Sequence, residues 1–237
     1  MKINVLDNSV AVIGFHEGLA GQVETWFEKC TGYHIACFIH EADSLCVNIE
    51  EENKKRVSQR TDFPINNTFK GRPLIISLNW IEELKKLGIK KVLPLNPYND
   101  ERYKQIKKCI ENNIELVSAI HPSSLIMDTA ILGKGICINC NCFIGYKSEI
   151  YDGVIINTGS QIDHHNVLKT CSQTDPATIM GGYVTLEERV HVHMGAIIIN
   201  RVTIGEGSII GIGSLILKNI PKDVIAYGHP AKVIKPK

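Results

Sequence analysis

Residues 156–166 read INTGSQIDHHN and concentrate polar side chains of types that can transfer protons. Asp163, His164 and His165 are consecutive, and Asn157 lies seven residues before His164. Histidine suits proton abstraction at neutral pH because its unperturbed pKa is about 6.5, and a nearby carboxylate orients the ring and favours the imidazolium. A lone histidine is more often a plain surface residue, but this combination favours a histidine that acts as a general base.

These residues lie in a repeat with a period of six. Stepping by six from Ile126 to Ile216 gives sixteen positions, of which fifteen are aliphatic and one is Thr174. The position four after each anchor is mostly small or β-branched, and the position directly after each anchor is often Gly, Asn, Asp or Glu. Neither a helix nor an alternating strand enforces this period. The pattern predicts a parallel β-helix of hexapeptide repeats with about 18 residues per coil.

The repeat predicts which residues stack on successive coils. Gly182, of the pair Gly181-Gly182, is expected directly above His164. Two explanations fit a glycine there: a ligand approaches the backbone closely, so that the N–H faces the oxygen of an attacked carbonyl, or a tight corner needs a positive φ. The same repeat favours buried packing thiols over a metal site for the group Cys137, Cys140 and Cys142.

The first half of the chain has a different pattern. Up to about residue 119, short apolar runs at 10–14, 33–39, 74–77, 90–95 and 115–120 alternate with amphipathic helical stretches, which predicts a small Rossmann-like α/β domain with a parallel sheet. The highly charged stretch 47–62 is interpreted as a solvated helix or loop.

Overall composition narrows the partners. The formal net charge of +1 provides no basic field for nucleic acid or anionic lipid. No window approaches 18 uncharged apolar residues, and no secretory signal is recognised, so we expect a cytoplasmic chain without membrane insertion. The eight cysteines are then expected to be free thiols, and no resident metal is expected.

Four segments carry a family resemblance: IHPSS at 120–124, IINTGSQIDHHNVL at 155–168, VTIGEGSIIGIGSLILKNIP at 202–221 and GHPAKVI at 228–234. With them the chain resembles the left-handed β-helix acyltransferases, specifically the sialic acid O-acetyltransferase and UDP-amino-sugar N-acetyltransferase family of bacterial glycan synthesis. The resemblance implies a nucleotide-sugar-binding domain at 1–119 and an acyltransferase domain at 120–237.

The resemblance also implies a homotrimer with active sites between neighbouring prisms and acetyl-CoA along a prism edge. It makes His164 the base, Asp163 the acid beside it, Asn157 an active-site amide and Gly182 the oxyanion-binding N–H. Many members carry a second histidine nine residues after the base, where this chain has Gln173, so the acceptor contacts there stay open. His165 is expected to point away from His164, because neighbours along a strand face opposite sides.

Further binding residues follow from the same likeness. The segment GFHEGLAG places glycines between a strand and a helix, where backbone N–H groups can hold a phosphate, although a plain strand-to-helix turn explains it as well. The residues expected on the sugar-nucleotide side are Gly14, Gly18, Gly21, His40, Glu41, Asp43, Asn96, Asn99, Arg102 and Gln173. Those expected on the CoA side are Gly181, Gly182, Lys218, Lys222 and Lys232.

The function predicted from these features is acetyl-CoA-dependent N-acetylation of a nucleotide-linked amino sugar by direct transfer. One alternative is O-acetylation of a sugar hydroxyl, as in the sialic acid type. Another is a non-catalytic trimeric protein that binds sugar nucleotides. A third is a zinc hydrase on the same fold, since His191 and His193 could join His164 and His165 around one ion.

Overall fold

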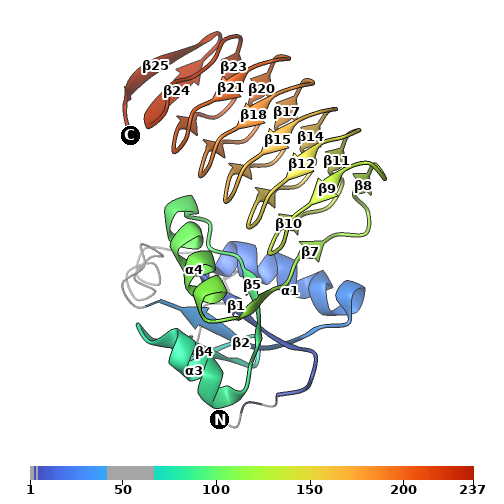
Figure 1. Ribbon diagram of the computed structural model, residues 1–237, viewed down its shortest axis with the longest axis vertical. Helices are drawn as coiled ribbons and strands as arrows, with labels where there is room; N and C mark the ends of the chain where they lie inside the picture. Colours follow the sequence, from blue (N-terminus) through green and yellow to red (C-terminus); the bar gives the residue numbers. More distant parts are fainter. Residues whose placement is uncertain (1–2, 4, 42–66) are drawn as a thin grey trace, which may run out of the picture. The chain divides into compact units, whose positions relative to one another are not determined.

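The computed structural model describes residues 3, 5–41 and 67–237; the charged stretch 47–62 and Asp43 lie outside them. The chain divides into two compact units, Met1–Val117 and Ser118–Lys237. Each unit forms its own hydrophobic core, and each is described separately below (Figure 1).

The first unit is built on a six-stranded sheet in the order β3-β4-β2-β1-β5-β6. Its strands are β1 (Ser9–Ile13), β2 (His34–His40), β3 (Thr68–Phe69), β4 (Arg72–Ile76), β5 (Lys91–Pro94) and β6 (Glu115–Leu116). All neighbouring pairs are parallel except β3 with β4. Central strand β1 is buried along its whole length, as expected of a parallel sheet covered by crossover helices.

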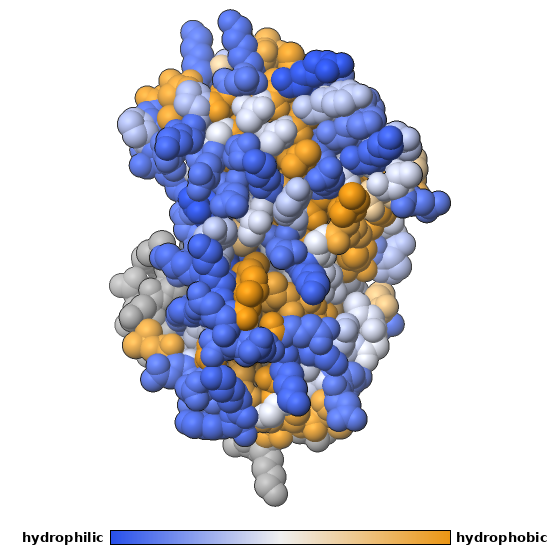
Figure 2. All heavy atoms as spheres, viewed as in Figure 1, coloured by the Kyte–Doolittle hydropathy of each residue, from blue (hydrophilic) through white to orange (hydrophobic). Residues whose placement is uncertain are grey.

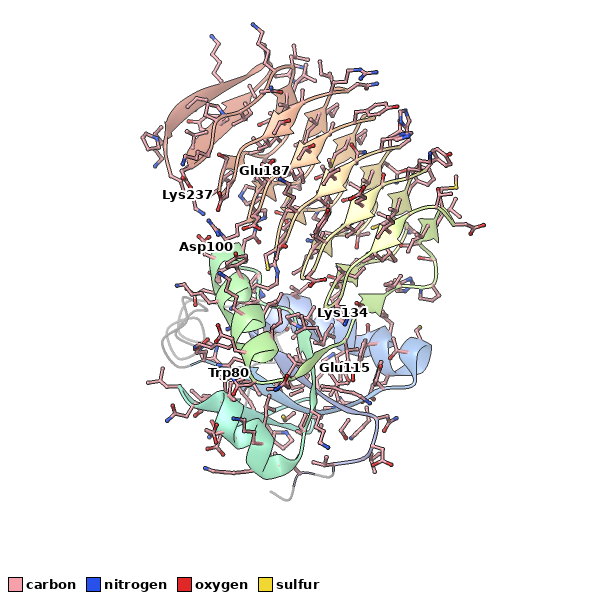
Figure 3. All side chains as sticks on the ribbon, in the orientation of Figure 1. Trp80, Asp100, Glu115, Lys134, Glu187 and Lys237 are labelled. Atoms are coloured by element: carbon pink, nitrogen blue, oxygen red, sulfur yellow. The ribbon has the colours of Figure 1, made fainter. Side chains whose placement is uncertain are left out.

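Three helices connect these strands: α1 (Glu17–Thr31), α3 (Trp80–Leu87) and α4 (Asn99–Glu111). Helices α1 and α3 both end at a glycine in the left-handed conformation, Gly32 and Gly88, whose N–H groups cap the last turn. Trp80 and Leu84 form the buried face of α3, and Trp80 is labelled in Figure 3. The predicted α/β class of this unit is confirmed.

The second unit is a triangular prism of two-residue strands, which Figure 1 shows as rows of short arrows. The first face holds β7 (Ala119–Ile120), β10 (Cys137–Ile138), β13 (Ile155–Ile156), β16 (Gln173–Thr174), β19 (His191–Val192) and β22 (Ile209–Ile210). The second holds β8 (Leu125–Ile126), β11 (Phe143–Ile144), β14 (Gln161–Ile162), β17 (Ile179–Met180), β20 (Ile197–Ile198) and β23 (Leu215–Ile216). The third holds β9 (Ile131–Leu132), β12 (Glu149–Ile150), β15 (Val167–Leu168), β18 (Thr185–Leu186) and β21 (Thr203–Ile204).

Parallel pairing confirms the predicted repeat and the left-handed β-helix. Ile138 pairs with Ile156, Ile156 with Thr174, and Thr174 with Val192, always 18 residues apart. The aliphatic anchors fill the interior, and burying each one stabilises the fold by roughly 1.5–3 kcal/mol. Thr174 keeps its place in this interior, where its hydroxyl donates to Ser160 Oγ at 3.3 Å.

Two further features complete the prism. The strands β24 (Val224–Gly228) and β25 (Ala231–Pro236) form an antiparallel hairpin that extends the first face. The prediction of a single strand at 115–120 is wrong, because β6 joins the sheet of the first unit whereas β7 begins the first coil of the second unit. Within the described residues, no helix has the length and apolar character needed to cross a membrane.

Candidate active site

His164 and His165 are the two central residues of the turn that follows β14, and Asp163 lies between the strand and the turn. His165 has φ of +56°, so strand alternation does not determine where its side chain points. The ring Nδ1 atoms of the two histidines lie 3.0 Å apart. The expectation that these rings point away from each other is therefore wrong.

The Asp163 carboxylate contacts the backbone of this turn. Its Oδ1 accepts a hydrogen bond from the His164 backbone N–H at 2.8 Å, while His165 contacts the His164 ring. A hydrogen bond between two neutral imidazoles needs one Nδ1 proton. When His164 donates that proton, its Nε2 carries the free lone pair, which is the state that a general base requires.

Aromatic side chains from the neighbouring coils hold the His165 ring. Tyr183, one coil further on, stacks on it with ring centroids 4.6 Å apart and an angle of 12°. Tyr146 meets it edge-on at 5.5 Å, and the Arg201 guanidinium lies 4.6 Å from the centroid of Tyr183. The stack restricts His165 and, through it, the ring of His164.

Gly182 lies directly against His164, as the repeat predicted. A Cβ added at Gly182 would lie 2.3 Å from Cε1 and 2.6 Å from Nε2 of His164, and the residue does not have a positive φ. Close approach, not backbone conformation, therefore requires glycine here. Among the described residues the Gly182 N–H makes no hydrogen bond, whereas the Gly181 N–H donates to Ile198 O at 2.9 Å.

Asn157 lies at a different corner of the prism, in a column of polar residues spaced by 18. Asn139 Nδ2 donates to Asn157 Oδ1 at 2.8 Å, and Asn157 Nδ2 donates to Asp175 Oδ1 at 3.3 Å. On the next coil, His193 Nδ1 lies 2.9 Å from Asp175 Oδ2. The column thus joins four successive coils through side-chain contacts.

Gln173 and His191 complete this cluster from the neighbouring column. Gln173 Nε2 donates to Asp175 Oδ1 at 2.9 Å, and His191 Nε2 lies 3.1 Å from Asp175 Oδ2. Burial alone would raise the pKa of the Asp175 carboxyl, but the hydrogen bonds from His191, His193 and Gln173 hold it well below its usual range. Asp175 is therefore a carboxylate at neutral pH.

Asp175 was not among the residues predicted from the sequence, although its spacing of 18 residues from both Asn157 and His193 could have identified it.

The zinc alternative is not supported within one chain. His164 and His165 follow β14 on the second face, whereas His191 lies in β19 on the first face and His193 directly follows it. The chain brings His191 and His193 to Asp175, and not to the other histidine pair.

In the first unit, Gly14 and Asn96 lie at the carboxyl ends of the neighbouring strands β1 and β5. Gly14 has φ of +79°, and a Cβ there would lie 2.2 Å from Asn96 Cβ. The order of the sheet reverses between these strands, the usual place for a ligand in such folds. Gly18 and Gly21, in α1, have looser surroundings: a Cβ would lie no closer than 3.5 Å to a neighbour.

Arg102 supports this edge of the sheet from within. Its side chain is fully buried, and its guanidinium donates to Asn96 O at 2.5 Å and Asn99 Oδ1 at 2.9 Å. These hydrogen bonds fix the loop after β5. Asn96 is also fully buried, and its Nδ2 donates to Gln105 Oε1 at 3.2 Å.

His40 ends strand β2, and Glu41 directly follows it beside this network. Glu41 accepts hydrogen bonds from Gln105 Nε2 and from the ammonium group of Lys108. His40 is buried, its Nδ1 has no hydrogen-bond partner among the described residues, and burial lowers its pKa. The neutral imidazole thus keeps an unused polar atom close to the carboxyl end of the sheet.

The three expected CoA lysines are exposed near the end of the prism. Lys218 and Lys232 line one pocket of about 380 Å³ together with apolar residues such as Ile216, Leu217 and Val233. Lys222 does not line this pocket. The arrangement offers two cations beside an apolar surface.

Two solved structures resemble nearly the whole chain. A histidine-to-alanine mutant of GDP-perosamine N-acetyltransferase from Caulobacter crescentus, in complex with CoA and GDP-perosamine, is 27% identical and superimposes with a TM-score of 0.81 over 98% of this chain and 99% of that one. The acetyltransferase domain of PglB from Neisseria gonorrhoeae shares the fold, with a TM-score of 0.77 and 22% identity over 96% and 100% of the two chains. No family model matches the chain.

Each curated relative matches only part of this chain. Serine acetyltransferase of Buchnera aphidicola is 31% identical over 140 residues, which are 58% of this chain and 48% of that protein. The chain spans about half the length of the curated relatives it matches. In its hexapeptide repeat and its prism the chain is similar to these acetyltransferases, and its likeness to the GDP-perosamine N-acetyltransferase extends over both units.

Proposed function

We propose that this protein transfers the acetyl group of acetyl-CoA to the amino group of a nucleotide-linked amino sugar. The observation that carries the proposal is the likeness over nearly the whole chain to an N-acetyltransferase in complex with CoA and GDP-perosamine. That likeness includes both units, so it accounts for the α/β unit as well as for the prism. The His164 turn supplies the chemistry that the reaction needs.

His164 acts as the general base in this proposal. The amino group attacks the thioester carbonyl, and His164 Nε2 takes the proton that the nitrogen loses. The N–H of Gly182, which makes no other hydrogen bond among the described residues, donates to the tetrahedral oxyanion. The C–S bond then breaks, the proton reaches the departing sulfur, and the products are CoA and an amide.

His165 holds the base in the correct tautomer. Its Nδ1 accepts the Nδ1 proton of His164, which leaves the Nε2 lone pair of His164 free. Asp163 fixes the turn by accepting a hydrogen bond from the His164 backbone N–H. These proposed roles differ from those expected in the sequence analysis. Asp163 positions the backbone of the turn, and His165 positions the ring of His164.

The first unit binds the nucleotide in this proposal. Gly14 lets the segments after β1 and β5 approach closely, and α1 begins three residues later with N–H groups suited to a phosphate. His40 and Asn99 lie at the same edge, and Arg102 holds Asn99 by a hydrogen bond. Gly18 and Gly21 leave room on the first turns of α1.

The pocket lined by Lys218 and Lys232 suits the phosphate-bearing end of CoA, since it combines two cations with apolar walls. Lys222 would meet the same phosphates from outside the pocket. The Gly181 N–H donates a hydrogen bond within the β-ladder of the prism, so we assign Gly181 a structural role beside the thioester.

We further propose a homotrimer in which Asn157 and Gln173 of one chain complete the His164 site of another, because one chain holds these residues at different corners. Exposed apolar residues along the prism, among them Leu125, Ile131, Ile179 and Ile197, provide surface for such packing. Figure 2 shows apolar patches between polar side chains on the visible face. The reaction is assigned to the cytoplasm, where acetyl-CoA is available, and its product to polysaccharide biosynthesis.

The test is CoA release in the presence of acetyl-CoA and a panel of GDP-, UDP- and dTDP-linked 4-amino sugars, each beside its 4-hydroxy counterpart. The proposal expects rapid release with at least one amino sugar and little with its hydroxy partner. Preference for the hydroxy sugars would establish O-acetylation. Tight nucleotide-sugar binding without turnover would support a non-catalytic binding protein.

A further inference from the structure

Asp175, His191 and His193 lie on two adjacent coils and are fixed by the ladder between them. Gln173 pairs with His191 and Thr174 with Val192, and the Asp175 N–H donates to Val192 O at 2.8 Å. The His193 N–H donates in turn to Ile210 O at 2.9 Å. Because the backbones are held in this way, the three side chains meet with little loss of conformational freedom.

The three ligand atoms converge. His193 Nδ1 lies 2.9 Å and His191 Nε2 lies 3.1 Å from the same carboxylate oxygen, Asp175 Oδ2, and all three atoms lie within 4.8 Å of one another. In a tetrahedral site with bonds of about 2.0–2.2 Å, ligand atoms lie roughly 3.3 Å apart. We propose that Asp175, His191 and His193 bind a divalent transition-metal ion, at a site separate from His164.

Further hydrogen bonds hold the Asp175 carboxylate in place, as is usual for the ligands of a metal ion. Oδ1, the oxygen that faces away from the histidines, accepts hydrogen bonds from Gln173 Nε2 at 2.9 Å and from Asn157 Nδ2 at 3.3 Å. Asn157 is itself oriented by Asn139 at 2.8 Å. Such an outer layer fixes the rotamer of the ligating side chain, so that Oδ2 stays directed at the two imidazoles.

His191 Nε2 lies 3.1 Å from Asp175 Oδ2 and 3.2 Å from Gln173 Nε2. When Nε2 carries a proton, it donates to the carboxylate, and Gln173 donates to Asp175 Oδ1. A cation that replaces this proton takes the lone pair of Nε2 and leaves the hydrogen bond from Gln173 to Asp175 in place.

Two imidazole nitrogens and one carboxylate oxygen suit zinc, cobalt, nickel and ferrous ions. The side chains are 21% exposed for His191, 35% for His193 and 14% for Asp175, so solvent or a ligand can reach a remaining coordination position. The site adjoins Asn157 and Gln173, which the family resemblance assigns to the reaction. The proposal itself concerns binding of the ion and does not depend on the proposed function.

The experiment is a titration of chelator-treated, tag-free protein with Co²⁺, followed by its visible absorption, and with Zn²⁺, followed by calorimetry and metal analysis. We expect one ion per chain and a visible band of a four- or five-coordinate cobalt site. Asp175→Asn and His193→Ala should each weaken binding by at least tenfold, by analogy with the effect of removing ligand support. His121→Ala, which removes a histidine from the same column beyond Asn139, should bind like wild type.

Circular dichroism shows whether each variant is folded, and Asp175→Asn, which keeps the shape of the side chain, tests the site if His193→Ala does not fold. Equal metal binding by wild type, Asp175→Asn and His193→Ala would overturn the proposal. Binding of less than one ion per chain by the wild type would do the same. Acetyl transfer is measured separately, so that a failure of metal binding and a failure of the proposed function are distinguished.

Discussion

Two corners of the same prism show how one repeat supports different chemistry. At the corner of His164, one imidazole is held by another, which in turn is held by aromatic stacking, and a glycine leaves the base in contact with a free backbone N–H. At the corner of Asp175, a partly buried carboxylate contacts the side chains of Asn157, Gln173, His191 and His193. The repeat fixes the spacing at both corners, but the side chains decide which atoms each corner presents.

The largest effect that would separate the two corners is expected for His164→Ala. Loss of a positioned base should lower kcat by roughly a hundredfold to ten-thousandfold. Thermal stability should change little, because the ring is only half-buried. Steady-state kinetics with a nucleotide-linked amino sugar, together with a melting curve, measure both. A variant with wild-type kcat would show that the base lies elsewhere.

Gly182→Ala tests the contact between the base and the backbone. Its methyl group would lie 2.3 Å from His164 Cε1, so the ring must move away from the N–H. We expect kcat to fall by about a hundredfold, the scale for losing one oxyanion donor. Gly159→Ala is the matched control: that glycine has φ of +72° and open space around it, so strain should lower stability without changing kcat.

His165→Ala is expected to have the next largest effect. Without the Nδ1 partner, His164 samples the wrong tautomer, and kcat should fall by roughly ten- to a hundredfold, the scale seen when an orienting partner is removed. The profile of kcat against pH should change as well, which a purely structural loss would not cause. An unchanged profile with a small decrease in kcat would mean that Tyr183 and Gly182 alone orient the base.

The smallest effect is expected for Thr174→Val, inside the prism below the Asp175 corner. The change restores an aliphatic anchor and removes a hydrogen bond to Ser160 of 3.3 Å, so the free energy of unfolding should change by no more than about 1 kcal/mol. Chemical denaturation measures this change. A loss of several kcal/mol would show that the polar interior holds the Asp175 corner in place.

The sequence predicted the prism because its period is a direct consequence of coil geometry. Six-residue anchors such as Ile156 and Ile162 can bury their side chains in the same core only when each face takes one repeat. The same spacing predicted the contact of His164 with Gly182. It could also have predicted the column of Asn157, Asp175 and His193, which shares the 18-residue step.

Other features depend on conformation that spacing does not determine. His165 lies in a turn with φ of +56°, so the alternation rule for strands gave the wrong direction. Arg102 is expected on the sugar-nucleotide side, but its spacing does not reveal that the loop after β5 folds around its side chain and buries it fully. The apolar run at 115–120 is continuous in sequence but is divided between two sheets. Its first part, β6, pairs within the first unit, and its last part, β7, pairs within the second.

The most direct test of the central claim is the structure of the product formed by wild type and by His164→Asn from acetyl-CoA and a GDP-linked 4-amino sugar. Mass spectrometry and NMR should show one acetyl group joined through an amide at the sugar nitrogen with wild type, and unchanged sugar nucleotide with the folded variant. An ester at a hydroxyl group, or equal product from both proteins, would contradict N-acetylation with His164 as the base.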